Sequence, residues 1–222
     1  MAEHRHHFKI AGIPVRVEPV FFVIAVLFGL QLADEDPTLV VVWVGVTFVS
    51  ILVHELGHAL TLKAFGQPSE ITLQGLGGVT VSRRHLDRTK SVLVSLAGSI
   101  TALALLWAPA RTLYGTTWYW QQDLWVRGAV YFTAYANLWW SVANLLPIRP
   151  LDGGNVVTEL FGARAARRIS LVAAAAGGAW AITHEQPYAG FFALFLALGS
   201  YQEIAAEKGS APPAPPDLFG RR

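Results

Sequence analysis

Residues 54–58 read His54-Glu55-Leu56-Gly57-His58, and they lie within an apolar run, 39–62, that is long enough to cross a membrane. On a helix, His54 and His58 stand one turn apart on one face, so their imidazoles can converge on a single metal ion. Glu55 lies beside them, where it can take a proton from a metal-bound water. Ionisable side chains are costly in hydrocarbon, which favours a functional site over the alternative, a polar helix patch with a structural metal or none.

The composition indicates a membrane protein. Of 222 residues, 53% are hydrophobic and only 14% are charged, whereas a soluble domain carries about a quarter of charged residues. The chain has no cysteine, which excludes disulfides and thiolate metal ligands. Its net charge of +2 comes from basic residues scattered among short loops, so we expect no binding to nucleic acid. The polar N-terminus predicts no cleavable signal peptide.

Six apolar segments predict an all-α membrane protein with about six transmembrane helices. The segments are 20–33, 39–62, 91–110, 129–147, 169–183 and 188–202. The second, third and fourth are long enough to span a bilayer. The first, fifth and sixth are nearer 15 residues, a length that also suits re-entrant or buried helices or a gate.

The charges predict the orientation. With the N-terminus in the cytoplasm, every Lys and Arg except Arg111 and Arg127 falls on the cytoplasmic side. The positive-inside rule therefore predicts cytoplasmic N- and C-termini in a bacterial cytoplasmic membrane. We expect residues 1–208 to form a single polytopic domain. The Pro-rich segment 209–222 cannot hold a helix and is expected to be a disordered cytosolic tail.

A second motif offers the third ligand that a catalytic zinc requires. Residues 144–154 read Asn-Leu-Leu-Pro-Ile-Arg-Pro-Leu-Asp-Gly-Gly, so Asp152 follows an apolar span on a turn rich in proline and glycine. Such a break is tolerated in a membrane only where protein or a water-filled cavity covers the backbone. The alternatives are that Asp152 caps a helix beginning near Val156 and that Asn144 merely hydrogen-bonds between helices.

The two motifs together, H-E-x-x-H and, about ninety residues later, N-x-x-P-x-x-x-L-D-G, resemble the site-2 protease family of intramembrane zinc metalloproteases. The similarity covers roughly residues 8–201. The resemblance implies that His54, His58 and Asp152 bind one Zn²⁺ per chain and that Glu55 is the general base. It also implies that Asn144 contacts the substrate backbone or the oxyanion.

One element departs from the family pattern. Many members carry a G-x-x-x-N-like element at the start of the third core span, but here Gly98-Ser99-Ile100-Thr101-Ala102 ends in alanine. The polar contact of that asparagine is either missing or supplied by Ser99 or Thr101. The PDZ and CBS domains of some relatives are absent, so we expect regulation by a prior cut in the substrate or by a membrane partner.

Residues 71–81 alternate polar and apolar side chains around a Gly-rich turn, which predicts a small β-hairpin following the zinc-motif helix. Site-2 proteases cut membrane substrates, and we hypothesise that one hairpin edge pairs with the unwound substrate helix by strand addition. A plain surface ribbon is the alternative.

The sequence thus predicts an intramembrane zinc endopeptidase that cuts in or near the transmembrane segment of a membrane protein or a signal-peptide-like substrate in the lipid bilayer. The alternatives are a membrane metal transporter or metal sensor that uses the His/His/Asp cluster, and a catalytically dead scaffold.

Overall fold

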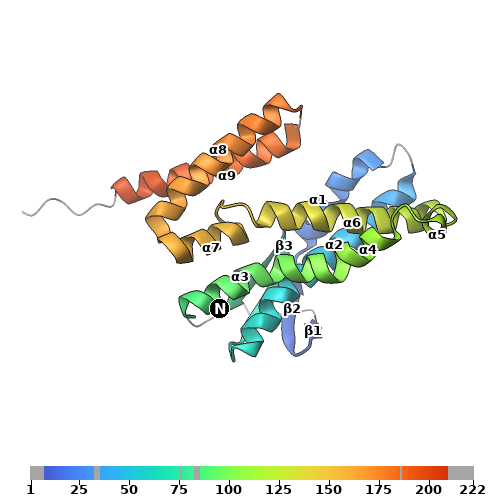
Figure 1. The fold of residues 1–222 in the computed structure, drawn as a ribbon, viewed down its shortest axis with the longest axis horizontal. Helices are drawn as coiled ribbons and strands as arrows, with labels where there is room; N and C mark the ends of the chain where they lie inside the picture. The colour runs from blue at the N-terminus through green and yellow to red at the C-terminus, as the bar shows by residue number, and fades with distance from the viewer. Residues whose placement is uncertain (1–7, 33–35, 76, 83–85, 186, 210–222) are drawn as a thin grey trace, which may run out of the picture.

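The computed structural model describes residues 8–32, 36–75, 77–82, 86–185 and 187–209, which form a set of helices with a small sheet at one side (Figure 1). The helices are α1 (Pro19–Gly29), α2 (Pro37–Ala64), α3 (Arg88–Ala102), α4 (Ala108–Leu113), α5 (Thr117–Trp120), α6 (Leu124–Asn144), α7 (Asp152–Phe161), α8 (Ala163–Thr183) and α9 (Pro187–Gly209). A 3₁₀ turn (Leu30–Leu32) follows α1, and a π-helical turn (Leu103–Trp107) joins α3 to α4. The strands are β1 (Phe8–Ile10), β2 (Ile13–Val17), β3 (Ser69–Gln74) and β4 (Gly77–Ser82).

Each of the six expected apolar segments contains a helix, but six transmembrane spans are not confirmed. Among the described residues, two helices are long and apolar enough to cross a membrane: Pro37–Ala64 and Arg88–Leu113, with mean hydropathies of 2.1 and 1.9. Pro19–Gly29 and Ala189–Ala205 are apolar but shorter. The predicted tail lies outside the described residues from 210 onward, and its separation from the domain stays a prediction.

The two longest apolar helices begin at acidic N-caps. The Asp36 carboxylate accepts hydrogen bonds from the backbone N–H and the hydroxyl of Thr38, at 2.8 and 2.7 Å. The Asp87 carboxylate accepts from the backbone N–H of Lys90 at 3.0 Å. These bonds satisfy amides that a helix start leaves free. They also lower the pKa of both carboxyl groups, chiefly through the Thr38 hydroxyl at Asp36 and the Lys90 amide at Asp87.

The predicted hairpin is confirmed as β3 and β4, but it belongs to a four-stranded sheet of order β1-β2-β3-β4. The structure is mostly helical, as expected, but strands β1 and β2 enlarge the predicted hairpin into a sheet. Strand β2 pairs in parallel with β3, with Val15 opposite Ile71. The partners lie on either side of α1 and α2 in the sequence, so no local pattern signals the pairing.

One face of the sheet packs against α2 next to the metal-binding motif. The buried cluster there comprises Ile13, Val15, Val17, Phe21, Ile51, Leu52, Ala59, Ile71 and Leu73. Because β-branched and leucine side chains of β2 and β3 alternate toward α2, their burial holds the sheet on this helix. The sheet therefore lies beside the residues 54–58.

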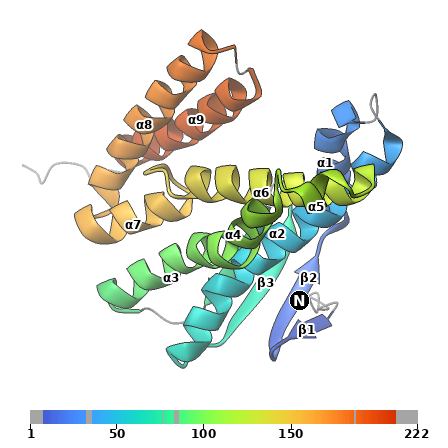
Figure 2. The same cartoon turned by 45° about the vertical axis from the view of Figure 1, so that its right-hand side comes forward.

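Helices α8 and α9 form a pair that leans away from α2 and α3 and joins them through α7 (Figures 1 and 2). Ile148, in the loop before α7, is buried against Ala174 of α8 and Leu196 of α9. The backbone N–H of Arg149 donates to the Ser170 hydroxyl at 3.0 Å. The loop that leads into Asp152 is thus anchored on the α8–α9 pair.

Candidate metal centre

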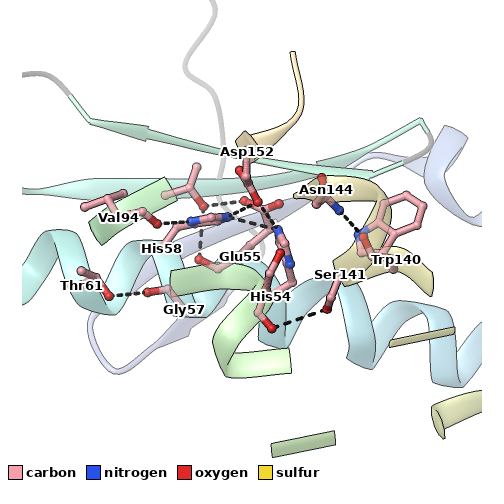
Figure 3. A network of polar contacts seen from close by, with 12 residues as sticks. His54, Glu55, Gly57, His58, Thr61, Val94, Trp140, Ser141, Asn144 and Asp152 are labelled. Atoms are coloured by element: carbon pink, nitrogen blue, oxygen red, sulfur yellow. Dashed lines mark hydrogen bonds and ion pairs between the residues drawn. The ribbon is translucent and has the colours of Figure 1, made fainter. Parts of the chain in front are cut away.

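Helix α2 supplies three buried ionisable side chains (Figure 3). His54, Glu55 and His58 are 3%, 5% and 7% exposed. Gly57 lets α3 approach this segment, because a Cβ at that position would lie 2.6 Å from the Ala97 carbonyl oxygen and 2.7 Å from Thr101 Oγ1. The glycine of the motif therefore serves close helix packing, which brings α3 over the two histidines.

Three ligand atoms from α2 and α7 form a small triangle. His54 Nε2 lies 3.1 Å from His58 Nε2, and Asp152 Oδ2 lies 3.1 Å from His54 Nε2 and 3.3 Å from His58 Nε2. A tetrahedral zinc with bonds of about 2.0–2.1 Å separates its ligand atoms by about 3.3–3.4 Å. The triangle therefore fits a zinc ion, and the structure brings Asp152 together with the two histidines, as expected from the sequence. Their role as zinc ligands stays a prediction.

The surroundings of the triangle orient its ligands. His58 Nδ1 lies 2.6 Å from the Val94 carbonyl oxygen of α3, so Nδ1 carries the proton and Nε2 presents its lone pair to the centre. Asp152 Oδ2 is buried and has no hydrogen-bond donor in the described part of the chain. At Gly98 of α3, a Cβ would collide with Nε2 of His58 and lie 2.8 Å from Nε2 of His54. These features leave the space that a metal requires.

Helix α7 is fixed at both ends. A Cβ at Gly153 or Gly154 would overlap backbone atoms of residues 145–149, so the glycines that follow Asp152 let the helix start tightly against its own loop. At the other end, the Arg88 guanidinium donates to the carbonyl oxygens of Glu159 and Leu160. A cation at the last carbonyls stabilises a helix end. Asp152 is the first residue of α7, so the helix begins before the expected Val156, and no side-chain capping hydrogen bond is found at this helix start among the described residues.

The Glu55 carboxylate faces strand β4. Its Oε2 atom accepts a hydrogen bond of 2.6 Å from the Thr80 hydroxyl. A Cβ at Gly78 would lie 2.7 Å from both Cδ and Oε1 of Glu55. Reasoning from the sequence missed Thr80 at the site, although the alternation of the predicted hairpin places Gly78 and Thr80 on one face.

Asn144 ends α6 on the same side as the centre (Figure 3). Its Nδ2 atom donates to the Trp140 carbonyl oxygen at 3.0 Å, one turn back on its own helix. An amide NH₂ has two protons, so a second donor remains for another partner. The structure brings Asn144 near the site, and its contact with a substrate stays a prediction.

Neither Ser99 nor Thr101 makes a side-chain hydrogen bond to the centre in the described part of the chain. The Ser99 hydroxyl is buried without a partner among the described residues, and Thr101 packs against Gly57. A separate polar contact lies nearby: the buried Asn137 of α6 donates from Nδ2 to the Ser50 hydroxyl of α2, at 2.9 Å. Ser50 stands one turn before His54. An asparagine in the middle of an apolar span was the available signal.

Comparison with known proteins shows that the chain is similar to zinc metalloproteases. Residues 86–182 match the model of Peptidase family M50. The zinc metalloprotease MJ0392 of Methanocaldococcus jannaschii is 26% identical over 156 residues, which cover 69% of this chain and 44% of that protein. The putative zinc metalloprotease Rip3 of Mycobacterium tuberculosis is 32% identical over 199 residues, which cover 76% of this chain and 50% of that protein. The chain thus spans about half the length of these curated relatives.

The fold has a counterpart among solved structures. The site-2 protease from Methanocaldococcus jannaschii superposes with a TM-score of 0.59 at 22% sequence identity. The match covers 90% of this chain and 94% of that chain. The arrangement of helices and sheet described above is therefore that of a site-2 protease.

Proposed function

The chain belongs to peptidase family M50, the site-2 proteases, and from this membership we propose that it is an intramembrane zinc endopeptidase. In this proposal it hydrolyses a peptide bond in or near the transmembrane segment of a membrane protein. The observation that carries the proposal is the ligand triangle of His54, His58 and Asp152 with Glu55 beside it.

Each residue at the site has a chemical role in the proposal. His54, His58 and Asp152 hold the zinc, which when bound lowers the pKa of a coordinated water toward neutrality. The Glu55 carboxylate accepts the proton of the attacking water and passes it to the leaving amide nitrogen. The second N–H of the Asn144 amide donates to the substrate backbone or to the oxygen on which negative charge develops.

A helical substrate must unwind before hydrolysis, and its freed amides then need partners. Strand β4 is at the edge of the sheet in the described residues, so its outer backbone groups can take up an extended strand. Val79 and Val81, 43% and 48% exposed, lie on the face away from Glu55. We expect Val79→Pro to impair cleavage of a helical substrate, because the proline removes the N–H that pairs with β3 and so disrupts the strand that the substrate would join. Unimpaired cleavage by this variant would reject strand addition and leave the zinc chemistry untouched.

The cellular setting belongs to the same proposal. We place the chain as a multi-pass protein in a bacterial cytoplasmic membrane, with both termini cytoplasmic. Its partners are the lipid bilayer, a single-span or signal-peptide-like substrate, and a regulatory membrane protein. The lopsided distribution of Lys and Arg supports this orientation.

A metal transporter is the second candidate, and the structure disfavours it. In the described part of the chain, His54, His58 and Asp152 are the one group of three or more His, Asp or Glu side chains close enough to share an ion. Transport requires successive binding sites along a path. A single buried site with a neighbouring carboxylate suits hydrolysis.

The Glu55→Gln variant tests the function. Purified protein is incubated with a peptide that carries one transmembrane segment, and zinc is measured by mass spectrometry. We expect about one zinc per chain in wild type and variant, with cleavage reduced about 10²- to 10⁴-fold in the variant because the base is lost. Cleavage that survives the substitution would assign hydrolysis to another group or to a contaminant.

A further inference from the structure

Strand β4 brings one hydroxyl to the carboxylate beside the metal ligands. Thr80 Oγ1 lies 2.6 Å from Glu55 Oε2 and 3.2 Å from the Glu55 backbone oxygen. A hydroxyl has one proton, and the shorter distance is that of a charge-assisted O–H···O⁻ bond. The proton therefore goes to the carboxylate.

We propose that Thr80 is a positioning residue for Glu55: its hydroxyl holds the carboxylate in the orientation from which it takes the proton of the attacking water. The inference rests on the proposed protease function and deepens it. Glu55 is 5% exposed, and a buried carboxylate requires a donor to stay ordered. Thr80 supplies that donor from outside α2, so the sheet sets the orientation of the base.

The approach of β4 to α2 depends on Gly78, two residues before Thr80. Side chains of a strand alternate, so Gly78 and Thr80 face the same side. A Cβ at Gly78 would overlap the Glu55 side chain. Strand β4 therefore approaches Glu55 closely at Gly78, which has no side chain, and hydrogen-bonds to it through the Thr80 side chain.

The register of the hairpin directs the backbone N–H and C=O groups of Gly78 and Thr80 toward the outer edge of β4. Leu73, opposite Gly78, uses its carbonyl oxygen on the other side, where it accepts from the Glu18 N–H at 2.9 Å. In an antiparallel ladder, such a pair exchanges no hydrogen bonds, and every second pair repeats this pattern. The N–H and C=O groups of Gly78 and Thr80 consequently point away from β3, toward the edge that can receive a substrate strand.

Thr80 thus has two roles in the proposal: its hydroxyl binds the Glu55 carboxylate, and its main-chain groups lie at the edge that can receive the substrate. A substrate strand that pairs with Thr80 is placed in a fixed relation to the Glu55 carboxylate. A misplacement of about 1 Å between a catalytic group and the reacting bond can lower the rate by about 10²-fold.

Three variants of the full-length protein test the assignment with the transmembrane reporter peptide. Thr80→Val keeps the branched shape and removes the hydroxyl, and Thr80→Ser keeps the hydroxyl. Ser82→Ala is the matched control, because the Ser82 hydroxyl lies on the same strand and has no partner among the described residues. Zinc content and the thermal midpoint are measured for all three.

We expect Thr80→Val to lower kcat about 10- to 100-fold with KM changed less than about twofold. Its zinc content should match wild type, and its thermal midpoint should fall because the buried Glu55 carboxylate loses its donor. Thr80→Ser should recover most of kcat, and Ser82→Ala should behave as wild type.

Three results would overturn the assignment: a wild-type kcat in Thr80→Val, equal losses in Thr80→Val and Thr80→Ser, or loss of zinc in Thr80→Val. Failure of the wild-type protein to cleave the reporter would instead reject the protease function, and the assignment to Thr80 with it. The two failures are therefore distinguishable.

Discussion

His54 Nε2 lies 3.1 Å from Asp152 Oδ2, which joins the middle of α2 to the first residue of α7. Both atoms also lie within 3.3 Å of His58 Nε2. The three distances between these ligand atoms are close to those between three corners of a zinc coordination tetrahedron.

Removal of a triangle residue should release the metal. We expect His54→Ala and Asp152→Ala to reduce zinc from about one per chain to well under half, because a catalytic site with two protein ligands binds weakly. Zinc is measured by mass spectrometry on detergent-purified protein. Full zinc retention in Asp152→Ala would show that the two motifs do not form one site.

Gly98→Ala should disturb the centre from α3. The added Cβ would collide with both imidazoles, and overpacking of this kind costs about 1–3 kcal/mol. We expect a lower thermal midpoint and weaker zinc binding. Gly45→Ala is the control, since a Cβ there meets no atom within 4 Å of the described structure. That variant should be neutral or stabilised by about 0.5–1 kcal/mol, as expected for a helix interior. Normal zinc binding by Gly98→Ala would contradict the close approach of α3.

The hydrogen bond between Asn137 and Ser50 should contribute to stability and not to chemistry. A double-mutant cycle with Asn137→Ala and Ser50→Ala should give a coupling energy of about 0.6 kcal/mol, the usual size for polar contacts between membrane helices. Unfolding is followed in mixed detergent. Zinc content should remain at the wild-type level in all variants. A coupling energy of zero would mean that the bond adds nothing to the packing of α6 on α2.

Asp87 should make the start of α3 sensitive to acid. Its pKa is lowered in the folded protein, first by the backbone N–H of Lys90 and then by the Lys90 side chain. A group with a lowered folded pKa stabilises the fold above its unfolded pKa, near 3.8, and loses this contribution as the pH falls through the folded pKa. The thermal midpoint of wild type should therefore approach that of Asp87→Asn below about pH 4. A difference that persists unchanged at low pH would exclude the carboxylate as its source.

The proposed orientation can be tested with single cysteines, because the chain contains none. Thr89 in α3 and Gln121 after α5 are both exposed. In intact bacterial cells whose outer membrane has been permeabilised, a membrane-impermeant maleimide should label Gln121→Cys and not Thr89→Cys. Lysed cells should show both labelled. The reverse pattern would place the termini outside.

Local patterns in the sequence were sufficient for several features. Spacing along one helix predicts that His54 and His58 share a face, and alternation over 71–81 predicts the hairpin. Each of the six apolar segments holds a helix, because a continuous apolar run favours one. The number of helices that cross the membrane does not follow from the same runs, because length alone does not separate a span from a buried helix.

Resemblance to a family added what local patterns lack, namely that Asp152 joins the histidines of α2. Spacing along the chain carries no information about which loop approaches which helix.

The tertiary structure decided the contacts between elements distant in the sequence. The pairing of β2 with β3, the Asn137–Ser50 bond and the Thr80–Glu55 bond each join residues from separate elements. The periodicity of a segment shows which face it buries, but not the element against which that face packs. Gly78 and Gly98 show the physical reason. Because neither residue has a side chain, β4 can approach Glu55 and α3 can approach the two histidines. Such close approaches exist only in the folded chain.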